Sequence, residues 1–106
     1  MIEITVFTKE NEYIGIKSKG HAGYAEAGTD IVCAATSALM INTINAVEAF
    51  TNDKFNWNQS DGYLEYHLTG AISKSSALLM KTLVLGITDI QKNYGDEYIK
   101  IMIKEV

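Results

Sequence analysis

Residues 20–37 read GHAGYAEAGTDIVCAATS, and this stretch joins an N-terminal segment with strand periodicity to a long apolar segment. Gly20, Gly23 and Gly28 interrupt its first part, which is typical of a loop because glycine adopts backbone conformations that are closed to other residues. After Asp30 the glycines stop and most residues are apolar. The stretch therefore predicts a loop that leads directly into the start of a helix.

The apolar segment predicts one helix that ends at about Phe50, because neither glycine nor proline interrupts it. The side chain of Asp30 or of Thr29 can cap this helix by accepting a hydrogen bond from a first-turn N–H. Its larger apolar residues form two stripes, one of Val32, Ala35, Leu39, Ala46 and Phe50 and the other of Met40, Ile44 and Val47. The remaining side carries Ala34, Ala38 and Ala49. A helix that is apolar on most sides is buried on most sides, so we expect this to be the central helix.

The rest of the chain contains strand patterns and a second helix pattern. Alternating apolar and polar residues predict strands at 2–7, 13–19, 55–59, 63–69 and 99–103. Asp61-Gly62 favours a two-residue hairpin turn with positive φ at both positions. A second helix is expected from the Ser73 cap to the stop at Gly95. The order ββαββαβ predicts an α+β fold, a two-layer sandwich in which a mixed, mostly antiparallel sheet carries both helices on one face.

Composition narrows the class of protein. A chain of 106 residues has room for a single domain, residues 1–106, with a modest core. All nine basic residues are lysines and the net charge is −4, so we expect no direct binding of nucleic acid. One cysteine, no signal peptide and no apolar run close to ~20 residues predict a cytoplasmic protein without a membrane segment. Two histidines and one unclustered cysteine lack the spacing of a zinc site, so we expect no metal and no cofactor.

Cys33 and His21 carry the chemistry that this segment can offer. Cys33 falls in the first turn of the predicted helix, where free N–H groups and the helix dipole favour the thiolate. His21 lies at the other end of the loop, and its imidazole can take the thiol proton and later return it. The pair indicates a nucleophile and its general base. The alternative of a small core cysteine and a solvated loop histidine stays open at this point.

Three further residues have two interpretations each. Asp30 can cap the helix or orient His21 as the third member of a triad, and we favour the cap because an anion beside Cys33 opposes thiolate formation. Ser37 lies one turn after Cys33 on the same face, and it either donates to the thiolate or only packs. Trp57 is interpreted as a core residue of the second hairpin rather than as a platform for substrate.

These residues resemble the signature of the ribosomal-processing cysteine protease family, often called Prp. The resemblance rests on Gly20-His21-Ala22, on the run Gly28-Thr29-Asp30-Ile31-Val32-Cys33-Ala34-Ala35 and on Ser37. It implies that Cys33 is the nucleophile and His21 the general base, with Gly20, Asp30 and Ser37 in supporting positions. It also implies a homodimer, which the alanine side of the first helix favours as well.

The resemblance further implies an endopeptidase that removes the N-terminal extension of large-subunit ribosomal protein twenty-seven. His21 would deprotonate Cys33, the thiolate would attack the scissile carbonyl, and first-turn N–H groups would receive the oxyanion. We expect cleavage after an aromatic residue and before a small one, with Tyr24, Val32 and Met40 as candidates for an apolar cleft. Two other functions are compatible with these residues: a ribosome-associated module that binds a peptide without cleaving it, and a thiol redox sensor, which the lack of a second cysteine disfavours.

Overall fold

The computed structural model describes residues 1–26 and 30–106, which form one five-stranded sheet and two helices. In chain order the elements are β1 (Ile2–Lys9), β2 (Glu12–Lys19), α1 (Ile31–Phe50), β3 (Phe55–Ser60), β4 (Tyr63–Leu68), α2 (Lys74–Tyr94) and β5 (Ile99–Glu105). This order confirms the predicted ββαββαβ arrangement. The expectations for Gly28 as a loop glycine and Thr29 as an alternative cap fall outside the described residues.

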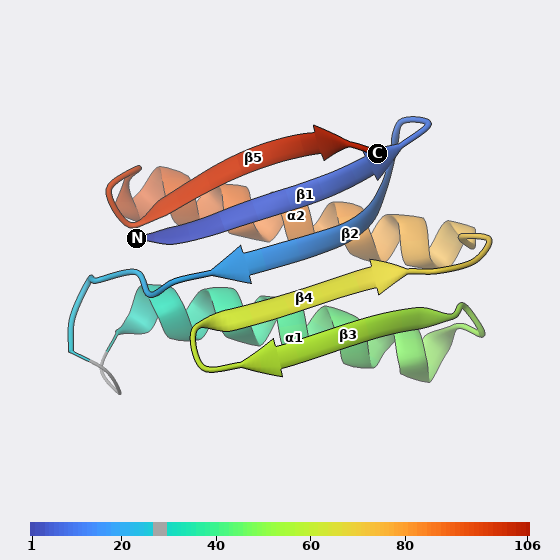
Figure 1. Cartoon of the computed structure of the whole chain (residues 1–106), viewed down its shortest axis with the longest axis horizontal. Helices are drawn as coiled ribbons and strands as arrows, with labels where there is room; N and C mark the ends of the chain where they lie inside the picture. Colours follow the sequence, from blue (N-terminus) through green and yellow to red (C-terminus); the bar gives the residue numbers. More distant parts are fainter. Residues whose placement is uncertain (27–29) are drawn as a thin grey trace.

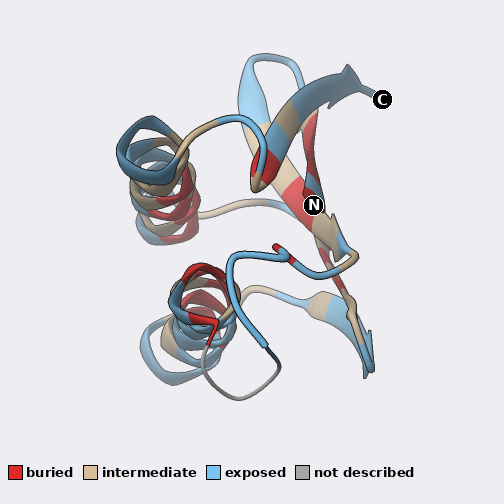
Figure 2. Cartoon of the chain, turned by 90° about the vertical axis from the view of Figure 1, so that its left-hand side faces the viewer, coloured by how far each residue is buried: buried red, intermediate tan, exposed pale blue. Residues whose placement is uncertain are grey.

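The sheet has the strand order β3-β4-β2-β1-β5. Neighbouring strands are antiparallel except for β1 and β5, which run parallel. This parallel pair arises because α2 crosses over the sheet between β4 and β5 (Figure 1). Figure 2 shows both helices on the same face, so the predicted two-layer sandwich with a mixed, mostly antiparallel sheet is confirmed.

The hydrophobic core lies between the helix layer and the sheet, where the buried segments face one another in Figure 2. Alternate residues of the central strands point into it, as strand periodicity requires. The fully buried side chains include Ile2, Ile4, Val6, Ile16 and Tyr66 from the sheet and Val32, Met40, Val47, Met80 and Ile87 from the helices. The two helices approach each other closely at Gly86, where an added Cβ would lie 2.9 Å from Leu39 Cδ1.

The prediction that α1 is central and buried on most sides is wrong. Its buried residues all lie on one side of the helix: Val32, Thr36, Met40, Thr43, Ile44 and Val47. The alanine side is exposed, and Phe50 at the end of the first stripe is 77% exposed. The reason is that α2 takes the other half of the sheet face, so among the described elements α1 packs on the sheet with one side and is flanked by α2.

Trp57 is not a core residue, contrary to the prediction, and 51% of its surface is exposed. It pairs across the strands with the fully buried Tyr66 and therefore belongs to the same face of the sheet. However, β3 is an edge strand, so within the described residues it has a neighbouring strand, β4, on one side only.

By length and composition alone, α1 meets the criteria for a membrane-crossing helix, as the one such helix within residues 1–26 and 30–106. The prediction that no segment spans a membrane is neither confirmed nor contradicted by this finding. Core helices of globular domains meet the same criteria, and α1 packs its buried side against the sheet and α2. The finding therefore carries no membrane assignment.

The residues with positive φ in the two hairpin turns differ from those expected. Gly62 has a φ of +67°, but Asp61 is not in the positive-φ region, so only one position of this turn has the predicted conformation. Both positions are positive instead in the first hairpin, at Glu10 (53°) and Asn11 (66°). That geometry is the type I′ arrangement, whose twist matches that of the flanking strands.

Candidate functional site

Three segments meet at one end of the molecule: the loop after β2, the start of α1 and the β3–β4 turn (Figure 1). The N–H of Gly20 donates to the carbonyl of Gly62 with a nitrogen–oxygen distance of 2.8 Å, which ties the start of the loop to that turn. Gly20 has a φ of +96°, and an added Cβ would lie 2.6 Å from the carbonyl oxygen of Met1. Only glycine fits this position, and the residue after it is His21.

Cys33 lies in the first turn of α1, as predicted, and its side chain is partly buried. Asp30 is the N-cap residue: its Oδ1 accepts a hydrogen bond from the N–H of Cys33 at 3.0 Å. Its Oδ2 accepts from the N–H of Tyr24 at 3.2 Å, which also fastens the loop to the helix. Both carboxylate oxygens are therefore used by backbone donors, and the geometry is that of the cap rather than that of a partner to His21.

The cap keeps Asp30 ionised. Burial raises the pKa of its carboxyl, but hydrogen bonds from the backbone N–H groups of Cys33 and Tyr24 outweigh burial, so the pKa lies below its ordinary value. The N–H of Cys33 is consequently engaged by an anion in the substrate-free protein. The expectation that this first-turn N–H is free to receive an oxyanion is not met in this arrangement.

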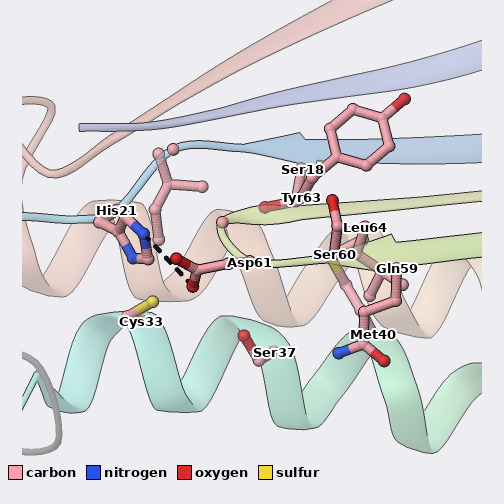
Figure 3. Close-up of a pocket in the computed structure, with 13 residues that line it drawn as sticks. Ser18, His21, Cys33, Ser37, Met40, Gln59, Ser60, Asp61, Tyr63 and Leu64 are labelled. Atoms are coloured by element: carbon pink, nitrogen blue, oxygen red, sulfur yellow. Dashed lines mark ion pairs between the residues drawn. The ribbon is translucent and has the colours of Figure 1, made fainter.

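His21 lies above the start of α1, and 61% of its side chain is exposed. Its Nε2 is 3.8 Å from Oδ1 of Asp61, which is an ion-pair distance when the imidazole is protonated. The ring lies against Gly62, where an added Cβ would be 2.9 Å from Nε2. Figure 3 shows Cys33 pointing from α1 towards His21 and Asp61.

The sequence showed Asp61 only as a turn residue and did not pair it with His21. The Asp-Gly dipeptide is the signal that was available, and it located the turn correctly. That the turn folds back beside the loop after β2 depends on the pairing of β4 with β2, which no local pattern specifies.

Two cavities of about 480 Å³ each open beside Cys33. They share four lining residues: His21, Cys33, Ser37 and Asp61. The first cavity extends between α1 and the sheet and has apolar side chains of Ile2, Met40 and Leu64 among its walls (Figure 3). The second extends towards the loop and is lined by Gly23, Ala25, Asp30 and Ala34 in addition to the shared residues. The thiol and the imidazole therefore lie where the two cavities adjoin, and an extended chain can pass from one to the other.

Of the three residues expected in an apolar cleft, Met40 lines the first cavity, whereas neither Tyr24 nor Val32 is among the described lining residues of either one. Val32 is fully buried, because it precedes Cys33 by one residue and so points to a different side of α1. The ring of Tyr24 makes edge contacts with Tyr94 and Tyr98, with centroid distances of 5.5 and 5.2 Å. These two expectations are corrected accordingly.

The second histidine, His67, lines neither cavity. His67 Nε2 lies 2.7 Å from Oε2 of Glu65, and its ring packs on Phe7 with centroids 4.8 Å apart. Hydrogen bonds from His67 and then from Tyr63 lower the pKa of Glu65 below its ordinary value.

Within residues 1–26 and 30–106, no three His, Cys, Asp or Glu side chains gather as metal ligands.

Comparisons with known proteins show similarity over nearly the whole chain. The family model described as cysteine protease Prp matches residues 1–100. The ribosomal processing cysteine protease Prp of Staphylococcus aureus is 26% identical over 97 residues, covering 90% of this chain and 91% of that protein. The Prp of Bacillus subtilis is 24% identical over 103 residues, covering 91% and 92%. The crystal structure of the S. aureus protease with a covalently linked product peptide superposes with a TM-score of 0.92 at 25% identity, covering 98% of this chain and 100% of that one.

Proposed function

We propose that this chain, which belongs to the cysteine protease Prp family and is a cysteine protease, removes the N-terminal extension of large-subunit ribosomal protein twenty-seven. The observation that supports the proposal most directly is the position of Cys33 and His21 between the two cavities. A peptide that occupies both cavities carries its backbone past the thiol. The relatives named as ribosomal processing proteases, one of them solved with a covalently linked peptide, support the same class of substrate.

The proposed reaction is acyl transfer through Cys33. The imidazole of His21 takes the thiol proton, and Sγ attacks the carbonyl carbon of the scissile peptide bond. As the carbon–nitrogen bond breaks, the imidazolium gives its proton to the leaving amine and an acyl thioester remains on Cys33. Water, deprotonated by His21, then adds to the thioester and releases the carboxylate, with the proton returned to the thiolate.

The oxyanion of the tetrahedral intermediate needs hydrogen-bond donors. The N–H of Cys33 donates to Asp30 in the substrate-free protein, so its use requires that this hydrogen bond be exchanged for one to the oxyanion. The hydroxyl of Ser37 is a second donor, because Ser37 lines both cavities together with Cys33. Asp30 and Ser37 are therefore proposed as supporting residues, alongside Gly20, whose conformation directs the start of the loop.

We propose that the first cavity takes an aromatic side chain of the substrate next to the scissile bond. Met40, Ile2 and Leu64 are apolar residues of the cavity wall, and their side chains lie almost fully buried behind it. Full burial of a phenylalanine side chain contributes about 1.5–3 kcal/mol, so its replacement by alanine should lower kcat/KM by roughly ten- to a hundredfold. The order of cleavage that we propose, after an aromatic residue and before a small one, comes from the family resemblance.

Two further properties belong to the proposal. We propose a homodimer, supported by the exposed apolar residues of α1, of which Ile31 is 50% and Phe50 77% exposed. We also propose a cytoplasmic location, supported by the single free cysteine, which suits a reducing compartment.

The deciding experiment incubates the protein with ribosomal protein twenty-seven carrying its N-terminal extension and follows the mass of that protein. We expect loss of the extension with the wild type and none with Cys33→Ala or His21→Ala, provided that each variant keeps the circular dichroism spectrum of the wild type. Peptides spanning the junction, with Phe→Ala changes, test the aromatic preference. If Cys33→Ala binds the extended protein and still cleaves it, the enzymatic proposal fails. Binding by the wild type without any cleavage would instead identify a peptide-binding module.

A further inference from the structure

We infer that Asp61 is a positioning residue for His21, so that the β3–β4 turn is a third component of the site beside the loop and the start of α1. The inference rests on the proposed function in one respect, because it assigns a role in the reaction of Cys33 and His21. It concerns a residue that stands outside the Gly20–Ser37 segment altogether.

Three contacts hold His21 against this turn. Nε2 of His21 is 3.8 Å from Oδ1 of Asp61. The ring packs on Gly62 so closely that an added Cβ would lie 2.9 Å from Nε2. The backbone hydrogen bond from Gly20 to Gly62, 2.8 Å long, fixes the residue before His21 to the same turn. One contact acts on the ring through charge and one through packing, while the backbone hydrogen bond fixes the start of the loop from which the ring extends.

Asp61 is also the carboxylate that remains available for this purpose. Among the described residues it is the acidic side chain within ion-pair distance of His21. Asp30, the other carboxylate beside the cavities, accepts backbone hydrogen bonds with both of its oxygens. Asp61 shares the walls of both cavities with Cys33 and His21, so a peptide bound there covers the pair.

The exposure of the pair determines when it acts. The side chains of His21 and Asp61 are 61% and 99% exposed, and water screens an ion pair of this kind strongly. A bound peptide displaces that water, and the attraction between an imidazolium and a carboxylate grows as the local dielectric falls. The contribution of Asp61 therefore belongs to the enzyme–substrate complex and to the steps that follow it.

The position of Asp61 favours one of the two tautomers of the neutral ring. With Nε2 facing Asp61, the neutral imidazole keeps its proton on Nε2 and leaves Nδ1 to accept the proton of Cys33. After that transfer the imidazolium faces a fixed negative charge, which stabilises it until the leaving amine takes the proton. Removing the carboxylate releases the ring to other orientations and to the other tautomer.

The test compares Asp61→Ala with Asp61→Glu, with Glu105→Ala as a control that removes a carboxylate at the far end of β5. We expect Asp61→Ala to lower kcat by roughly ten- to a hundredfold with KM changed less than twofold, because the effect lies in the reacting complex. Asp61→Glu should recover at least part of kcat, since it restores the carboxylate, and Glu105→Ala should match the wild type.

A spectroscopic measurement that does not need turnover accompanies the kinetics. In Cys33→Ala with bound junction peptide, imidazole ¹⁵N shifts of His21 should show mainly the Nε2-protonated tautomer, and the Asp61→Ala change should reduce that population. A kcat within twofold of the wild type, a loss confined to KM, or an unchanged tautomer population overturns the inference. Failure of the proposed function would differ, because then the wild type itself would leave the ribosomal protein uncut.

Discussion

The carboxylate of Asp30 accepts a hydrogen bond from the backbone N–H of Cys33, with 3.0 Å between Oδ1 and the nitrogen. Asp30, the N-cap residue of α1, is thus linked to Cys33, which carries the thiol. The same carboxylate accepts from Tyr24 in the loop that contains His21. One side chain therefore sets the start of the helix and the course of the loop together, and both elements of the candidate site depend on it.

The stability of the protein should fall in acid, and Asp30 and Asp53 should account for part of the loss. Hydrogen bonds from Ser76 and Ser73 lower the pKa of Asp53, while backbone donors overcome burial to lower that of Asp30. A carboxyl whose pKa is lower in the folded state stabilises the protein at pH values above the pKa of the unfolded state, which is near 4. This contribution is lost as the pH falls through the pKa of the folded state.

Urea unfolding at pH 6 and pH 3 measures this effect. We expect the free energy of unfolding of Asp30→Asn to change less between these two pH values than that of the wild type, because the amide still caps the helix but does not titrate. Asp89→Asn, an exposed change on α2, serves as the control. Equal pH dependence of wild type and Asp30→Asn would contradict the prediction.

Gly20→Ala should reduce both stability and activity. Its φ of +96° disfavours any residue with a Cβ, and the new carbon would lie 2.6 Å from the carbonyl oxygen of Met1, a backbone atom with little room to move. Backbone strain of this kind costs on the order of 1–3 kcal/mol before the clash is added. Thermal unfolding of Gly20→Ala and of Gly23→Ala makes a useful comparison, since Gly23 also has positive φ but no atom of residues 1–26 and 30–106 within 4 Å of its added Cβ. The prediction fails if the two variants unfold at the same temperature.

Ser37→Leu should abolish most activity while leaving the fold intact. Ser37 is exposed on α1 and lines both cavities, so a leucine there projects into the path between them. Leucine has a higher helix propensity than serine, and no loss of stability is expected. Kinetics on a junction peptide should show a kcat/KM at least tenfold lower, whereas Thr82→Leu, at an exposed position on α2, should cleave normally. Normal cleavage by Ser37→Leu would show that substrate does not cross this part of α1.

Sedimentation at micromolar concentration should reveal a species of twice the 11.7 kDa chain mass. The exposed side of α1 contains Ile31, Ala34, Ala38 and Ile41, which would bury apolar area in a dimer. Ile41→Glu should shift the equilibrium towards the monomer because it places a charge in that surface, and Glu48→Gln should leave it unchanged. A wild type that sediments only as a monomer contradicts the proposed homodimer.

The local pattern of the sequence was sufficient for the secondary structure. Alternation located all five strands, the Asp-Gly and glycine positions located turns, and the caps Asp30 and Ser73 located both helix starts. These features depend on interactions between residues close in the chain, such as the side-chain hydrogen bond from residue 30 to residue 33. The same local reasoning placed Cys33 in the first turn of α1 and His21 in the loop before it.

The sequence pattern was insufficient wherever the outcome depended on which surfaces meet. Apolar composition suggested that α1 is buried on most sides and that Trp57 is in the core, but the position of α2 and the edge location of β3 leave both partly exposed. Periodicity alone does not report how many layers cover a face. Val32 and Tyr24 were assigned to a cleft for the same reason, since their neighbours in space were unknown.

By itself, the sequence determined the order of the elements, and it predicted where α1 begins and which cysteine and histidine are candidates for chemistry, because each follows from short-range backbone preferences or from residue chemistry. Only the tertiary structure decided that the β3–β4 turn lies beside His21, that Asp61 faces its Nε2 and that two cavities adjoin at Cys33. These relationships arise from the antiparallel pairing of β4 with β2. That pairing brings residues 20 and 62 within hydrogen-bond distance, and it is fixed by burial of the whole sheet face against the helices rather than by any single stretch of chain.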